Sequence, residues 1–82
     1  MDELESRLVN CFATVFPELA PPEIPSVSMG SLASWDSLAG ITLISLIEEE
    51  FGISISPDDA AGLVSFGLIL DYLRKLSPED AA

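Results

Sequence analysis

Apolar residues recur at helical spacing in three stretches of the chain. In the stretch from residue 2 to residue 16 they recur on one face of a helix: Leu4, Leu8, Cys11, Phe12 and Val15. Acidic residues early in this stretch suit the positive end of a helix macrodipole, and Pro17 ends the pattern. The same spacing returns over residues 37–51 and 66–76. The pattern therefore predicts three longer helices.

Capping residues indicate where the later helices begin and end. Asp36 precedes the second helix, where its carboxylate can accept hydrogen bonds from the free N–H groups of the first turn. Gly52 is suited to end that helix, because glycine adopts the left-handed conformation without strain. Ser56 and Pro57 suit the N-cap and first position of a short third helix. Ser65 is the expected cap of the last helix.

A long proline-rich segment separates the first two helices. Residues 17–35 contain four prolines, a glycine and several serines, which predicts a loop. Such a length suits a connection that runs along an antiparallel helix pair. Four apolar residues are expected to fix it to the core: Ile24, Val27, Met29 and Leu32. The sequence thus predicts an all-α fold, a small four-helix bundle of three longer helices and one short one.

The second helix has two different faces. Its larger apolar face is expected to meet the core: Ala39, Gly40, Leu43, Leu46, Ile47 and Phe51. Leu38 and Ile41 lie instead on a face that is otherwise polar, shared with Thr42, Ser45, Glu48 and Glu49. Exposed aliphatic residues beside acids suggest a docking surface. Cover by the long loop, or isolated exposed residues without a role, would equally account for them.

Length and composition predict one folded domain over residues 1–82. Hydrophobic residues make up 49% of the chain, which excludes a disordered chain. Because only four Phe, one Tyr and one Trp are present, the core is expected to be aliphatic. Cys11 is the only cysteine, so no internal disulfide can form, and its place on an apolar face predicts a buried thiol.

The chain is strongly acidic. Fourteen acidic residues oppose three basic ones, for a net charge of −11. Such a surface repels nucleic acids and anionic membranes and attracts partners with basic patches, although the charge would also simply keep a small apolar protein in solution. The N-terminus lacks the regions of a signal peptide, and no apolar run approaches the roughly 20 residues of a membrane span. We therefore expect a cytoplasmic protein without stable membrane insertion.

Ser37 holds the most distinctive position for chemistry. The chain has no histidine, so a Ser-His-Asp arrangement is impossible, and the GxSxG motif is absent. With no histidine and only one cysteine, the usual set of zinc ligands is also missing, and the sequence has no calcium-binding loop motif. At a helix N-terminus, however, the serine can bear a phosphate ester, which free N–H groups and the helix dipole stabilise. The alternative is an ordinary first-turn serine.

Several motifs stand in a fixed order along the chain. Asp36-Ser37-Leu38 opens the second helix, and Glu48-Glu49-Glu50-Phe51 follows near its end. An Ile-x-Ile segment, a proline-acid start of the third helix and Asp71-Tyr72 come next. With this spacing and a length near eighty residues, the chain resembles acyl carrier proteins over essentially its whole length.

The resemblance implies a covalent cofactor on Ser37, directly after Asp36. A phosphopantetheinyl transferase would attach 4′-phosphopantetheine from coenzyme A. The thiol of this arm would hold an acyl group as a thioester, and the bundle can shelter that group between its helices. The chain itself is expected to be a monomer and not an enzyme.

The family docks its partners on the second helix. By position, Leu38 and Ile41 would supply apolar contacts, and Glu48 and Glu49 charged ones. The expected partners are acyl-loading ligases or synthases with basic docking patches.

This chain departs from the family beside the serine. Many members place carboxylates in the first two turns of the second helix, where this chain has Ala39, Gly40 and Thr42. The difference favours a specialised carrier for fatty-acid-like or secondary-metabolite biosynthesis. Two alternatives stay open: an aminoacyl or peptidyl carrier on the same fold, and an unmodified helical interaction module. Gly40 and Gly67 are further expected to loosen the core or change the acyl cavity.

Overall fold

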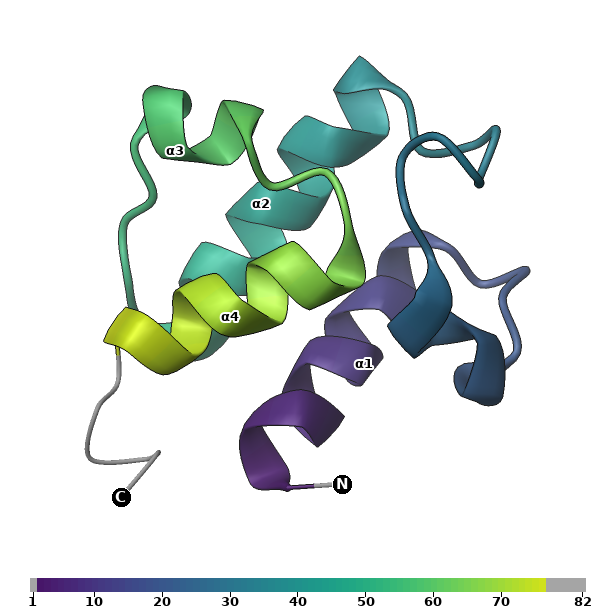
Figure 1. Cartoon of the computed structure of the whole chain (residues 1–82), viewed down its shortest axis with the longest axis horizontal. Coiled ribbons are helices and arrows are strands. Elements are labelled where there is room, and N and C mark those ends of the chain that lie inside the picture. The colour runs from purple at the N-terminus through teal and green to yellow at the C-terminus, as the bar shows by residue number, and fades with distance from the viewer. Residues whose placement is uncertain (1, 77–82) are drawn as a thin grey trace.

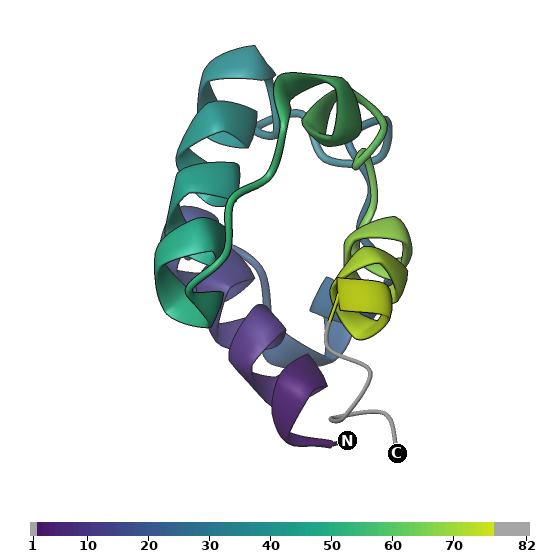
Figure 2. The same cartoon turned by 90° about the vertical axis from the view of Figure 1, so that its left-hand side faces the viewer.

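The computed structural model describes residues 2–76 as an arrangement of helices. Within these residues the α-helices follow in the order α1 (Glu3–Val15), α2 (Ser37–Phe51), α3 (Pro57–Ala61) and α4 (Phe66–Leu76). In Figure 1 α4 crosses in front of α2. Figure 2 shows these two helices on opposite sides of the molecule, with α1 at one end and α3 at the other. The predicted all-α fold, with three longer helices and one short one, is confirmed.

Each α-helix begins at a side chain that accepts a hydrogen bond from a backbone N–H three residues further on. These caps are Asp2, Asp36, Ser56 and Ser65, with donor–acceptor distances of 2.8 to 3.1 Å. Gly52 ends α2 in the left-handed conformation, with φ at 65°. The capping predictions for the later helices are therefore confirmed. None of the helices in the described residues is both long and apolar enough to cross a membrane.

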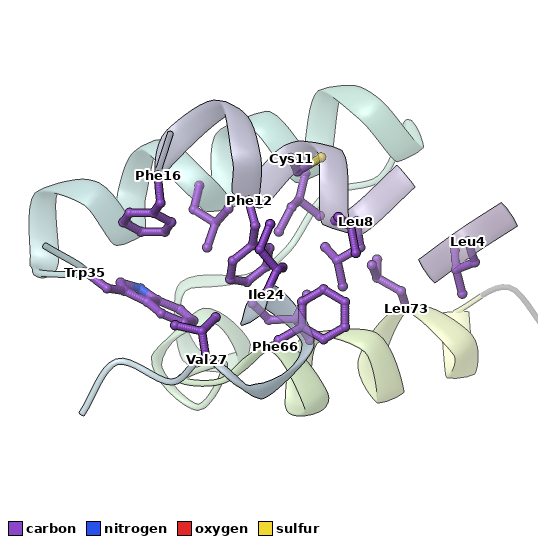
Figure 3. Close-up of a cluster of buried hydrophobic side chains, with 14 of the residues drawn as sticks. Leu4, Leu8, Cys11, Phe12, Phe16, Ile24, Val27, Trp35, Phe66 and Leu73 are labelled. Carbon is purple, nitrogen blue, oxygen red and sulfur yellow. The ribbon is translucent and has the colours of Figure 1, made fainter. Parts of the chain in front are cut away.

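Aromatic side chains occupy the centre of the core. Phe12, Phe16, Trp35 and Phe66 are buried, and their neighbouring rings lie 5.2 to 6.2 Å apart between centroids (Figure 3). The prediction of an aliphatic core holds for most of the buried residues, but it missed these four aromatic side chains, whose rings fill a large share of so small an interior. Aliphatic side chains surround the rings, and Cys11 is buried as predicted.

The segment between α1 and α2 is more ordered than its sequence predicts. It contains a short 3-10 helix, η1 (Pro21–Ser26), and an isolated antiparallel bridge between Ser28 and Ser65. Two backbone hydrogen bonds flank the bridge: Met29 N–H donates to Val64 O at 2.8 Å, and Phe66 N–H donates to Val27 O at 3.1 Å. The segment is thus tied to the start of α4.

The apolar residues of that segment differ in how well they anchor it. Ile24 and Val27 are buried and Leu32 is half-buried, as the sequence predicts. Met29 is 36% exposed and does not pack against the core, so the prediction that its side chain fixes the segment was wrong.

Arginine side chains join helix ends that are distant in the sequence. Arg7 of α1 binds Glu50 of α2, with 2.8 Å between Nε and Oε2, and its guanidinium lies 4.5 Å from the centroid of the Phe51 ring. Arg74 near the end of α4 binds Asp2 before α1, with 2.8 Å between Nη1 and Oδ2. The first contact holds the end of α2 to the first half of α1. The second holds the end of α4 to the start of α1.

Candidate functional site

Ser37 is the first residue of α2, and its side chain is exposed. On its N-terminal side Trp35 is buried in the core, with 4% of its surface exposed. Between them, the Asp36 carboxylate accepts a hydrogen bond from the Ala39 N–H at 2.9 Å. The backbone around Ser37 is therefore fixed. No described residue shares a hydrogen bond with its hydroxyl group.

Ser34 offers a direct contrast. Its hydroxyl donates a hydrogen bond to the carboxylate of Glu18, after the end of α1. This bond holds the pKa of the Glu18 carboxyl below its usual range. Ser34 therefore joins two segments of the fold, whereas the Ser37 hydroxyl stays available for reaction.

A largely apolar pocket of about 440 Å³ begins at Ser37. One wall is the side of α2 that runs from Ser37 past Gly40 and Ile44 to Glu48. At 1.5 Å per residue this wall is about 16 Å long. The opposite wall comes from Met29 and from residues of α3 and the segment after it. The pocket thus extends from the serine along the helix that bears it.

Of the two glycines that were expected to alter a cavity, only Gly40 lies at the pocket. Gly40 lines the pocket, and a Cβ added there would lie 3.5 Å from Nε1 of Trp35. Gly67 is outside the lining, and a Cβ added there would meet no atom within 4 Å. Of the core residues of α2, Leu43 lines the pocket, while Leu46 and Ile47 do not.

Leu38 and Ile41 are the most exposed large apolar residues of the described chain. Their side chains are 74% and 65% exposed, so no loop covers them. Ile41 borders the pocket that begins at Ser37. Leu38 borders a separate groove between the end of α1 and the start of α2. The two side chains therefore present open apolar surface on both sides of the serine.

The two glutamates assigned to docking have different surroundings. The Glu48 carboxylate is half-buried and accepts a hydrogen bond from the Ile55 N–H at 2.7 Å. Glu49 is exposed, and none of the described residues forms an ion pair or hydrogen bond with its side chain. Sequence reasoning grouped them because they share a helix face. It predicted that Gly52 ends α2, but not that the chain after Gly52 brings the Ile55 N–H back to Glu48.

Sequence reasoning also missed most of the pocket wall. Trp35, Leu63 and Val64 line the pocket but are not among the predicted site residues. The available signal was position: a large aromatic residue two places before Ser37 must pack near the start of α2. The segment after α3 carried no comparable signal.

The site has a restricted chemistry. The described residues include no group of three or more His, Cys, Asp or Glu side chains placed to hold a metal ion. What they offer is a free hydroxyl at the positive end of a 15-residue helix, next to an apolar pocket. Free N–H groups and the helix dipole at this end stabilise an attached phosphate ester.

Two comparisons with known proteins agree with this arrangement. A protein-family model described as "Phosphopantetheine attachment site" matches residues 6–73. The chain is also similar to a protein named acyl carrier protein from Desulforapulum autotrophicum. The two are 39% identical over 54 residues, which cover 66% of this chain and 70% of that protein.

Proposed function

Because the chain belongs to the acyl carrier protein family, we propose that it carries acyl intermediates on a 4′-phosphopantetheine arm joined to Ser37. The observation that carries this proposal is the free Ser37 hydroxyl at the start of α2 and at one end of the apolar pocket. The arm supplies a thiol on which an acyl group is held as a thioester. The chain is proposed to act as a single-domain carrier and not as a catalyst.

Attachment requires Ser37 Oγ to react with coenzyme A. Oγ forms a bond to phosphorus and loses its proton, while the phosphoanhydride bond of coenzyme A breaks and the nucleotide part leaves. A phosphopantetheinyl transferase must supply the base, because the chain has no histidine. The new phosphodiester is anionic, and the N–H groups at the start of α2 favour it there.

The pocket is suited to shelter the carried chain. Its volume of about 440 Å³ lies within the usual range of small-molecule sites. Ile41, Leu43 and Ile44 give its α2 wall an apolar character. This character supports an acyl cargo over an aminoacyl one, as does the name of the relative from Desulforapulum autotrophicum.

Docking is proposed to use the exposed face of α2. Leu38 and Ile41 would provide the apolar contact and Glu49 the charge. Glu48 would contribute less, because its carboxylate is already engaged with the Ile55 N–H. The partners would be a phosphopantetheinyl transferase and acyl-loading ligases or synthases with basic patches. The lack of acids between Ser37 and Glu48 supports a specialised carrier with dedicated partners.

Intact mass spectrometry tests the proposal. The chain is incubated with coenzyme A and a broad-specificity phosphopantetheinyl transferase, and a gain of one phosphopantetheine is expected. Ser37→Ala should gain nothing while melting at the same temperature, because the Ser37 hydroxyl makes no hydrogen bond in the described fold.

A folded parent chain that gains no mass, also with transferases of other specificity, would favour an unmodified interaction module instead. Equal gain by Ser37→Ala would place the attachment at another residue. Loading assays with fatty acids against amino acids then separate an acyl carrier from an aminoacyl carrier.

A further inference from the structure

Trp35 is held rigidly beside the proposed attachment site. Its indole lies 5.4 Å from the Phe12 ring and 5.8 Å from the Phe16 ring, measured between centroids. Figure 3 shows it at one end of the buried cluster, next to Phe16 and Val27. It is also one of the residues that line the pocket next to Ser37. One side chain is therefore both part of the core and part of the pocket wall.

The indole N–H has no acceptor within the described fold. No described residue accepts a hydrogen bond from Nε1. Every fully buried side-chain nitrogen and oxygen in the described residues has a partner, so Nε1 must belong to the small exposed part of the indole. Trp35 and Gly40 both line the pocket, and Nε1 is the indole atom nearest to the position of a Cβ at residue 40, so this donor lies on the side of the indole that faces the pocket. A Trp N–H at the edge of a core normally finds a hydrogen-bond partner, and because this one is reached from the pocket, an oxygen bound there can accept from it.

Gly40 leaves this donor uncovered. A Cβ at residue 40 would lie 3.5 Å from Nε1 and 3.9 Å from Cδ1, so any side chain there would cover this edge of the indole. The backbone conformation at residue 40 does not require glycine, because φ is positive in none of the described residues except Gly52. Glycine inside a helix is unfavourable relative to alanine. Access to Nε1 is the structural feature that Gly40 provides.

We propose that the Trp35 indole N–H is a hydrogen-bond donor for the carried chain, and that it binds a carbonyl or hydroxyl oxygen near the start of the pocket. This inference rests on the proposed attachment at Ser37. An oxygen that accepts from the Trp35 N–H has two chemical sources. One is an amide or hydroxyl group of the arm itself. The other is a polar acyl group, such as a 3-oxo or 3-hydroxy acid, folded back along the pocket.

The single indole N–H signal in a nitrogen-15 NMR spectrum tests the proposal, since Trp35 is the only tryptophan. Spectra are compared for the unmodified chain, the chain with the bare arm, and chains loaded with hexanoyl or 3-oxohexanoyl groups. Hydrogen bonding should move the proton signal downfield and slow its exchange with water roughly tenfold. If the arm supplies the oxygen, the indole signal should already shift in the chain with the bare arm. If the cargo supplies it, the signal should shift only in the chain loaded with the 3-oxohexanoyl group.

Two alanine variants locate the effect. In Gly40→Ala the new methyl group covers the indole edge at ordinary contact distance, so the downfield shift should be lost. Gly67→Ala is the matched control, because it makes the same change in a helix where nothing lies within 4 Å. It should behave like the parent chain.

The outcomes are distinguishable. A chain that gains the arm by mass but keeps its unmodified indole signal in every loaded form would overturn this inference alone. So would a full downfield shift in Gly40→Ala. A chain that gains no mass would overturn the proposed function, and this inference with it.

Discussion

At the scale of single residues, Ser34 and Ser37 show how local partners decide which hydroxyl can react. Both residues lie close to the start of α2, yet Ser34 is bonded to Glu18. The position of Ser37 at the first turn follows from the sequence, because Asp36 is a strong N-cap. The sequence does not reveal that the Ser37 hydroxyl is free. That depends on Glu18, in a distant segment, which accepts its hydrogen bond from Ser34 and not from Ser37.

Cys11 should be unreactive in the folded chain. Burial raises the pKa of its thiol from 9.0 to about 11, so the thiolate is scarce at pH 8. The folded state favours the protonated thiol, and this contribution to stability is complete below about pH 9 and lost as the pH rises through 11. Iodoacetamide at pH 8 should therefore label Cys11 slowly in buffer and rapidly in urea, as read by intact mass.

The modified chain provides an internal comparison for that experiment. The exposed thiol of the arm should be labelled at once, so the product in buffer carries one label and not two. Labelling of Cys11 in buffer at the rate seen in urea would contradict the burial of its thiol.

At the scale of elements, the half-buried Glu48 carboxylate joins the end of α2 to the segment that leads into α3. Ile55 is buried, with 8% of its surface exposed, so its N–H would lack a partner if the carboxylate were removed. Glu48→Ala should lower the free energy of unfolding by about 1–3 kcal/mol. Glu49→Ala, at an exposed neighbouring position, should change it by less than about 0.5 kcal/mol. Urea denaturation followed by circular dichroism measures both.

Glu48→Gln separates the hydrogen bond from the charge. Its side-chain carbonyl can still accept from the Ile55 N–H, so most of the lost stability should return. If Glu48→Ala unfolds at the same urea concentration as Glu49→Ala, the hydrogen bond does not support the fold.

Helix ends were predictable from sequence, whereas contacts between distant elements were not. Asp36 and Ser65 cap their helices through bonds to residues three positions on, so a local pattern reveals them. The bridge between Ser28 and Ser65 depends on a partner far along the chain, and no local pattern encodes it. No local pattern encodes the pocket either, because its second wall forms only when α3 and the segment after it lie opposite α2.

At the scale of the whole molecule, negative charge is poorly balanced. The net charge is −11, with only three basic residues in the chain. Arg7 and Arg74 are both engaged in ion pairs at helix ends. Composition was sufficient to predict this imbalance, but not where the arginines bind.

Added salt should stabilise the fold, because it screens repulsion among fourteen acidic residues more than it weakens the few ion pairs. We expect the Tm to rise by several degrees between low and high sodium chloride. A rise of about 4–8 °C corresponds to about 1 kcal/mol for a chain of this size. Thermal melts across a salt series provide the measurement, and a constant or falling Tm would show that repulsion among the acids does little to destabilise the fold.

The bridge between Ser28 and Ser65 also sets an order of events during synthesis. It closes the chain into a ring that contains α2 and α3, with α1 and α4 outside it. Ser37 leaves the ribosome well before Val64 and Phe66, the residues whose backbone groups close that ring. A nascent chain therefore displays the serine before its pocket exists. A transferase that recognises the folded site must wait until synthesis has passed the start of α4.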